Sequence, residues 1–261
     1  MPIAAPGCRG KTVTGSLPQD RTLVILQSNY IPWKGYFDLM NAADIFVVFD
    51  EVQYTRRDWR NRNRIVTGRA VKWLSIPVGT KGKYDAAISE IQVSDPDWAA
   101  KHWNTIRLAY GKAPFFAEYC DGLEDAYARA GAETHLSAVN RIFLQHLAPL
   151  LGIATDFADS TDIARTTQDP AARLVQICQG FGATRYLSGP AAKSYIDPAL
   201  FRDAGIALEY ADYAGYPEYP QRTDTFEHGV SVIDLLMHTG RDARGHLKST
   251  RPGGLFEQSE S

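Results

Sequence analysis

Residues 22–50 read TLVILQSNYIPWKGYFDLMNAADIFVVFD, and this stretch decides the fold. Residues 22–27 form a short apolar run of the kind that becomes a buried strand. A polar loop then leads to residues 37–43, which have a helical pattern. Residues 45–50 form a second apolar strand that ends in a carboxylate. The succession of strand, short helix and strand predicts a βαβ unit with two parallel strands.

The rest of the chain adds strands and helices in a definite order. Residues 64–67 and 71–78 flank a turn at Gly68, which indicates a β-hairpin, and residues 88–93 indicate a further strand. Residues 95–151 are mostly helical. Alternation then resumes, with strands predicted at 154–158, 184–188 and 206–210, and helices at 170–181 (capped by Asp169), 200–204 and 230–238. We therefore predict an α/β fold: a mainly parallel sheet with flanking helices, a β-hairpin insertion and a central helical segment.

The composition is that of a globular protein. Of the 261 residues, 44% are apolar and 22% are charged, so the chain has enough apolar residues to form a hydrophobic core. We expect one α/β domain at residues 22–240, with a helical subdomain at about 95–151. Residues 1–21 are predicted to be a flexible N-terminal extension, and residues 241–261 a C-terminal tail.

Charge and cysteine content restrict the partners and the compartment. The formal net charge is −2, which disfavours a general attraction to nucleic acid or to an acidic membrane. Cys8, Cys120 and Cys178 form no pair at metal-ligand or redox spacing, so a reducing compartment fits best. No apolar run approaches the ~20 residues that span a bilayer, and residues 1–20 lack the apolar core of a signal peptide. These features predict a cytoplasmic protein.

The loops that follow predicted strands are the first places to look for a site, because parallel sheets bind ligands at the carboxyl ends of their strands. The first such loop carries four polar side chains that can reach a ligand. They are Gln27, Asn29, Tyr30 and Lys34. The alternative is a plain connection whose aromatic residues pack on the core.

The second loop begins at Asp50, a carboxylate that could accept a proton as a general base or hold a metal ion. Five arginines follow between residues 56 and 64, and clustered guanidinium groups can hold an anion through paired N–H donors. The substrate-binding candidates in this segment are Gln53, Tyr54, Arg60, Asn61 and Arg62. The alternative is a solvated run whose charges compensate one another.

A third segment follows the predicted strand at 184–188, where a glycine turn with nearby lysine can bind a phosphate or carboxylate. Its candidates are Ser188, Gly189, Lys193 and Tyr195. The alternative is an ordinary turn.

The last helix supplies further candidates. Asp234 lies within an otherwise apolar stretch and shares a helix face with His238, and Gln221 precedes the helix. A carboxylate in such surroundings needs a partner or a function, and the alternative is a buried ion pair. His102 is the third catalytic candidate beside Asp50 and Asp234, with a satisfied core histidine as its alternative.

No Cys, His or Asp cluster has zinc-ligand spacing. The G-x-S-x-G elbow, the G-x-G-x-x-G fingerprint and the P-loop spacing are also absent from the sequence. The sequence therefore predicts no metal site and identifies no cofactor.

Several blocks of sequence together resemble the WbqC-like family. They are LQSNYIPWKGYFDLMNAADIFVVFDEVQY, NRNRI, WLSIPV, KHWNTIRLAYGKAPFF, YLSGPAAKSYID, GIALEY and SVIDLLMHTG, spread over roughly residues 22–240. One departure is Ser28, where a proline is usual after Gln27. The resemblance implies a role in the biosynthesis of O-antigen and other surface polysaccharides or of natural products. Acyl or aminoacyl transfer to an amino sugar or another amine is the reaction it implies.

The first loop is also similar, in position and in its Pro-aromatic-x-Gly pattern, to the H-x-G-H loop of nucleotidylyltransferase-like enzymes. Those enzymes hold triphosphate with histidines, and no histidine occupies the loop here, although Lys34 and the arginines could substitute.

Three functions follow from these patterns. The favoured one is an acyl or aminoacyl transferase that uses a small-molecule donor, such as a nucleotide sugar or a phosphorylated or thioester compound. Nucleic acid is not expected as a partner, although a tRNA-linked donor stays open. The alternatives are an ATP-dependent ligase or nucleotidylyltransferase-like enzyme, and a non-catalytic binding protein of the same pathway.

Overall fold

The computed structural model describes residues 20–251 and 254–256. At its centre is a sheet in the order β7-β2-β1-β8-β9, with every neighbouring pair parallel. Its strands are β1 (Thr22–Leu26), β2 (Ile45–Val48), β7 (Asp156–Asp159), β8 (Arg185–Ser188) and β9 (Ala207–Tyr210). The chain builds outward from β1 to β7 and then resumes with β8 on the other side of β1. This reversal between β1 and β8 is the switch point, the place where open α/β sheets bind ligands.

The central strand is apolar because it is covered on both sides. Leu23 and Val24 are fully buried, and Leu23 pairs with Ile45 of β2 and with Tyr186 of β8. A strand in this position reads as a continuous apolar run rather than as an alternating one. The predicted α/β fold with a mainly parallel sheet is confirmed.

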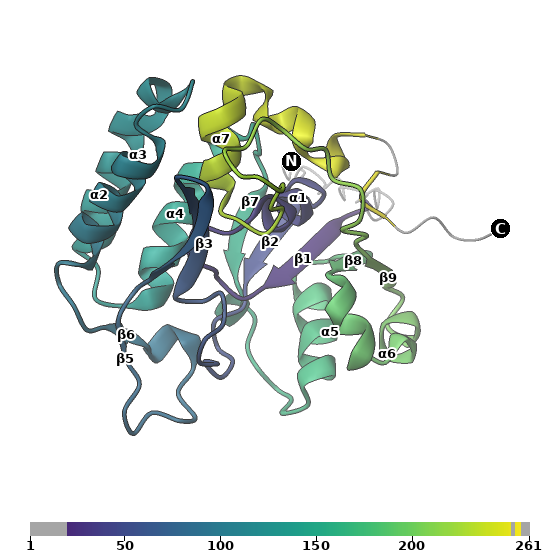
Figure 1. Cartoon of the computed structure of the whole chain (residues 1–261). Helices are drawn as coiled ribbons and strands as arrows, with labels where there is room; N and C mark the ends of the chain where they lie inside the picture. Colours follow the sequence, from purple (N-terminus) through teal and green to yellow (C-terminus); the bar gives the residue numbers. More distant parts are fainter. Residues whose placement is uncertain (1–19, 252–253, 257–261) are drawn as a thin grey trace, which may run out of the picture.

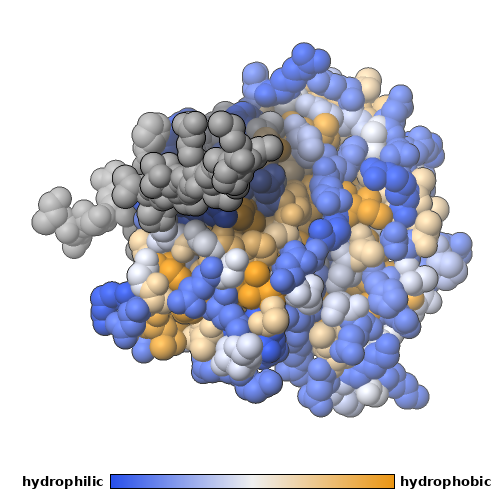
Figure 2. All heavy atoms as spheres, turned by 180° about the vertical axis from the view of Figure 1, so that it is seen from behind, coloured by the Kyte–Doolittle hydropathy of each residue, from blue (hydrophilic) through white to orange (hydrophobic). Residues whose placement is uncertain are grey.

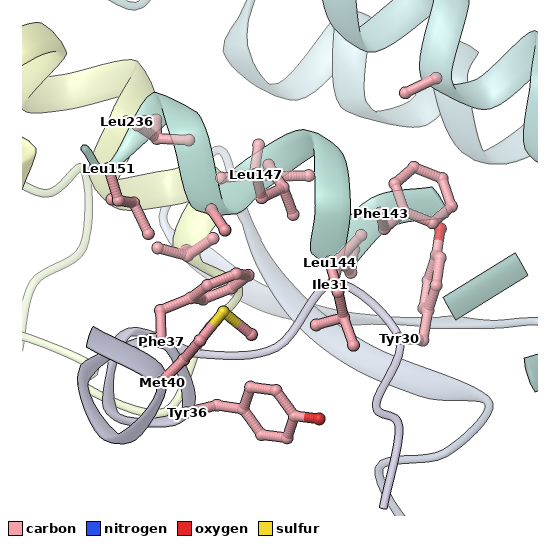
Figure 3. Close-up of a cluster of buried hydrophobic side chains, with 14 of the residues drawn as sticks. Tyr30, Ile31, Tyr36, Phe37, Met40, Phe143, Leu144, Leu147, Leu151 and Leu236 are labelled. Carbon is pink, nitrogen blue, oxygen red and sulfur yellow. The ribbon is translucent and has the colours of Figure 1, made fainter. Parts of the chain in front are cut away.

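Helices cover both faces of the sheet (Figure 1). On one face lie α1 (Lys34–Asn41), α4 (Leu136–Leu150) and α7 (Val232–Thr239), and on the other lie α5 (Pro170–Gly180) and α6 (Pro198–Asp203). Figure 3 shows the first layer, in which Phe37 and Met40 of α1 lie near Leu144 and Leu147 of α4. Helices α2 (Trp98–Tyr110) and α3 (Phe116–Gly131) pack against each other, and α3 packs on α4.

The predicted hairpin forms between β2 and α2. Strands β3 (Arg62–Thr67) and β4 (Ala70–Ser75) pair antiparallel around Gly68, which has φ of 63°. A second small pair joins β5 (Val78–Gly79) to β6 (Gln92–Val93). The strand expected at 88–93 is reduced to β6, because a 3-10 turn occupies Ile88–Glu90 and the Glu90 carboxylate accepts from the Ala87 N–H at 2.7 Å.

The two ends of the chain differ in what the structure describes. The extension predicted at 1–21 lies almost wholly outside the described residues. The expected domain boundary at 240 is followed by further packed turns, at Gly240–His246 and Lys248–Thr250. The N–H groups of Lys248 and Ser249 both donate to the Asp38 carboxylate at 2.8 Å, so hydrogen bonds hold this segment against α1.

The surface is mixed in polarity. On the face shown in Figure 2, hydrophobic residues form separate small areas among hydrophilic ones. No helix in the described part of the chain is both long enough and apolar enough to cross a bilayer.

Candidate functional site

A cavity of about 580 Å³ lies at the switch point of the sheet. It is bounded by the residues that end β1 and β8, by the segment after β2, and by the N-terminus of α5 on the α5 side of the sheet. Its lining consists of Ile25, Leu26, Gln27, Phe49, Val52, Arg60, Asp169, Pro170, Ala171, Leu174, Tyr186, Ser188, Gly189, Ala191, Ala192 and Tyr195.

The walls of this cavity are mainly aliphatic and aromatic, and its charged groups are few. Among the described residues that line it, Arg60 is the one cation and Asp169 the one anion. Gln27 and Ser188 add neutral polar groups at the strand ends. Such a cavity can bury an apolar group while a guanidinium holds an attached anionic or carbonyl oxygen.

Arg60 is held in place by the first loop. Its two terminal nitrogens donate to the side-chain oxygens of Gln27 and Asn29, and Asp58 lies 3.5 Å away as an ion-pair partner. The Arg60 Nε atom is buried and has no hydrogen-bond partner among the described residues. Of the arginines between residues 56 and 64, Arg60 therefore lines the cavity, and these contacts hold its guanidinium in position.

Asp50 follows β2 and binds the loop that follows β1, next to the wall of the cavity formed by Gln27 and Arg60. Its carboxylate accepts the Ser28 N–H at 2.8 Å and the Ser28 hydroxyl at 2.7 Å. The Asn140 amide of α4 donates to the Ser28 Oγ at 3.0 Å and to the Arg60 carbonyl at 2.9 Å. Asp50, Ser28 and Asn140 are all buried, so this network fixes the loop that carries Gln27 and Asn29.

Asp169 is a cavity residue that the sequence identified only as a helix cap. Its Oδ1 accepts the Ala172 N–H at 2.7 Å at the start of α5. Its second oxygen makes no hydrogen bond within residues 20–251 and 254–256. The signal in the sequence is topological, because a helix that follows a parallel strand begins at the ligand-binding end of the sheet.

A second polar cluster lies on the opposite face of the sheet, around Asp234 of α7. Asp234 is fully buried and accepts hydrogen bonds from Tyr110 at 2.9 Å, Tyr219 at 2.8 Å and Gln221 at 2.7 Å. Burial lowers the pKa of Lys34 to about 8, although the Asp234 carboxylate acts in the opposite direction. This cluster does not line the cavity at the switch point.

His238 belongs to the same cluster. Its Nδ1 lies 2.7 Å from the Asp234 carbonyl oxygen and 3.7 Å from the Asp234 carboxylate.

Tyr30 and His102 form a third cluster, within the helical layer. The Tyr30 hydroxyl lies 2.9 Å from the His102 Nδ1 and 2.6 Å from the Tyr127 hydroxyl. Figure 3 shows Tyr30 directed toward Phe143 of α4, and the two ring centroids are 5.4 Å apart. Burial lowers the pKa of His102 to about 4, so the imidazole is neutral near pH 7.

The other sequence candidates divide between the cavity and other parts of the fold. Ser188, Gly189 and Tyr195 line the cavity with Gln27 and Arg60. The remaining candidates lie elsewhere: Gln53 donates to the Tyr84 carbonyl at 2.8 Å, Asn61 donates to the Ile76 carbonyl at 2.8 Å, Arg62 stacks over Trp73 at 4.2 Å, Lys193 lies 5.3 Å from the Tyr210 ring, and Tyr54 packs in the core.

Within residues 20–251 and 254–256, no three His, Cys, Asp or Glu side chains are grouped as a metal site would require.

Comparison with known proteins identifies the family. Residues 27–246 match the WbqC-like protein family. An uncharacterized protein of Mycobacterium tuberculosis is 41% identical over 231 residues, which cover 88% of this chain and 99% of that protein. No solved structure matches significantly. The chain therefore belongs to the WbqC-like protein family.

Proposed function

We propose that this protein is an enzyme that transfers an acyl or aminoacyl group from a phosphorylated or thioester donor to an amine, such as that of an amino sugar. The reaction would serve the biosynthesis of a surface polysaccharide such as O-antigen, or of a natural product. The described cysteines, Cys120 and Cys178, are free thiols, which supports a cytoplasmic location for it.

The observation that carries the proposal is the chemistry of the cavity at the switch point. Its apolar walls suit an acyl group, and Arg60 suits the oxygen of the donor carbonyl or of an adjoining phosphate. A triphosphate would need several cations to balance its charge, whereas the described lining offers one guanidinium. The cavity therefore favours acyl transfer over an ATP-dependent ligase or nucleotidylyltransferase reaction.

The bond changes balance without a further reactant. The amine nitrogen attacks the donor carbonyl carbon, and a C–N bond forms while the C–O or C–S bond to the donor breaks. The departing oxygen or sulfur keeps the bonding electrons, and the amine proton goes to a base. Arg60 would stabilise the developing oxyanion.

Asp169 is the base in this proposal, because it borders the cavity and its second oxygen accepts no hydrogen bond in the described part of the chain. Asp50 is assigned a positioning role, since both of its oxygens already accept hydrogen bonds from Ser28. Asp234 and His102 are assigned to the buried clusters that support the layers around the sheet.

The test measures product mass. The purified chain is incubated with D-glucosamine and a panel of acyl-CoA, acyl phosphate and aminoacyl-tRNA donors, and the amine is examined for a gain of the acyl mass. Arg60→Gln is expected to lower the rate at least tenfold, since it removes a charged hydrogen-bond donor from the transition state. Arg56→Gln is the control, because Arg56 is an exposed arginine of the same segment that does not line the cavity and donates to the Thr80 carbonyl.

Two results would count against this function. One is the absence of any mass gain with every donor, accompanied by a rise in melting temperature with ATP and magnesium, which would favour the ligase alternative. The other is an equal rate for Arg60→Gln and Arg56→Gln, which would show that the cavity lined by Arg60 does not take part in the reaction.

A further inference from the structure

A smaller cavity of about 280 Å³ lies between the first loop, the arginine segment and the turn before α7. Its lining consists of Asn29, Pro32, Trp33, Trp59, Asn63 and Gly229. No ionised side chain is among them. The cavity is thus bounded by two indoles, a proline ring and amide groups, and it differs in kind from the cavity at the switch point.

The two indoles are fixed walls. Trp33 meets Tyr213 edge-on at a centroid distance of 5.0 Å, and its six-membered ring lies against the backbone at Gly35, where an added Cβ would be 2.3 Å from Cζ2. Trp59 lies 5.4 Å from Trp73, tilted by 35°. Trp59 is 39% exposed, so part of its indole is accessible to a ligand.

The polar groups of the cavity leave one amide available. Asn63 is committed, because its Nδ2 donates to the carbonyls of Tyr30 and Ile31 and its Oδ1 accepts the Arg64 N–H. Asn29 accepts from Arg60 through Oδ1, and its Nδ2 has no partner in the described part of the chain. A hydroxyl group of a ligand can accept a hydrogen bond from this amide.

The two cavities meet at one pair of side chains. Arg60 lines the larger cavity and donates to Asn29, which lines the smaller one, and Trp59 is the neighbour of Arg60 in the chain. A group bound in the smaller cavity would therefore lie across Arg60 from a donor in the larger cavity. This arrangement suits two substrates that must meet.

We infer that the smaller cavity is the acceptor subsite and takes a polyhydroxylated six-membered ring that carries the reacting amine. Its role as acceptor subsite rests on the proposed function. The C–H face of such a ring packs on an indole, and a ring hydroxyl accepts from Asn29. Arg60 and Arg64 adjoin the cavity, with the Arg64 guanidinium 5.8 Å from the Trp59 ring. Each guanidinium is paired with a carboxylate, Arg60 with Asp58 at 3.5 Å and Arg64 with Glu227 at 3.2 Å.

The experiment measures binding of the acceptor in the absence of any donor. Saturation-transfer NMR on the full chain follows D-glucosamine, with ethanolamine as an amine that lacks the ring. We expect saturable transfer to the glucosamine ring protons and at least tenfold weaker binding of ethanolamine. Trp59→Ala and Asn29→Ala are each expected to weaken glucosamine binding at least tenfold. Tyr84→Ala is the control, because Tyr84 is an exposed aromatic residue that does not line the cavity.

The outcomes separate this inference from the proposed function. Glucosamine binding that requires Trp59 and Asn29 supports the subsite even if no donor yields product, and in that case only the transferase proposal fails. Binding that is unchanged in both variants, with folding verified by circular dichroism, overturns the subsite even if transfer occurs. Equal binding of ethanolamine and glucosamine also overturns it.

Discussion

The Asp50 carboxylate accepts both the N–H and the hydroxyl of Ser28, at 2.8 and 2.7 Å. These bonds join the loop after β2 to the loop after β1 at the ligand-binding end of the sheet. Because Asp50 and Ser28 are buried, the bonds are charge-assisted and shielded from water. The shape of the cavity rim therefore depends on a carboxylate that does not line the cavity.

Asp50→Asn should destabilise the fold. The amide oxygen can keep one of the two hydrogen bonds, and the amide nitrogen then faces a second donor, so we expect a loss of about 2–3 kcal/mol in the free energy of unfolding. Urea denaturation monitored by tryptophan fluorescence measures this change. A loss below about 0.5 kcal/mol would mean that the Ser28 bonds contribute little net stability.

Asp169→Asn should separate catalysis from stability. Asparagine caps a helix about as well as aspartate, so the free energy of unfolding should change by less than about 0.5 kcal/mol. Loss of the base should lower kcat/KM by roughly 10²–10⁴-fold, because the amide cannot take the amine proton. The two quantities are measured on the same preparation by urea denaturation and by the transfer assay. Full activity in this variant would exclude Asp169 as the base.

The α/β fold is predictable because β1 and β2 are short apolar runs separated by a helical pattern, and because strands and helices alternate again after the helical segment. Clustered arginines in the sequence likewise predict that an arginine binds an anion. Which of the five arginines lies at the cavity follows only from the structure, where Arg60 contacts Gln27 and Asn29. The hydrogen-bond partners of Asp234 could not be predicted from the sequence, because Tyr110 lies 124 residues away along the chain. Asp169 reads as a cap because its place beside the cavity arises only when α5 docks on the sheet.

His102 should make the protein sensitive to acid. Its pKa falls from an ordinary 6.5 to about 4 through burial, so the unfolded chain binds a proton first as the pH drops. The neutral imidazole therefore contributes stability above pH 6.5 that is lost as the pH falls toward 4. Between pH 7 and pH 5 we expect the wild type to lose about 1–2 kcal/mol more than His102→Gln. Urea midpoints of both proteins at the two pH values provide the comparison, and equal losses would contradict a neutral buried imidazole.

Gly35→Ala distinguishes the packing of Trp33 from helix propensity. Residue 35 lies in the first turn of α1, where alanine would ordinarily stabilise a helix by up to about 1 kcal/mol over glycine. Here the new Cβ would lie 2.3 Å from the Trp33 Cζ2 atom, so the indole must shift. We expect a net destabilisation of about 1–3 kcal/mol and weaker glucosamine binding in the smaller cavity, because Trp33 forms one of its walls. Thermal unfolding and saturation-transfer NMR test the two effects. An increase in stability with unchanged binding would show that the Trp33 ring moves aside at no cost and is not a fixed wall of the cavity.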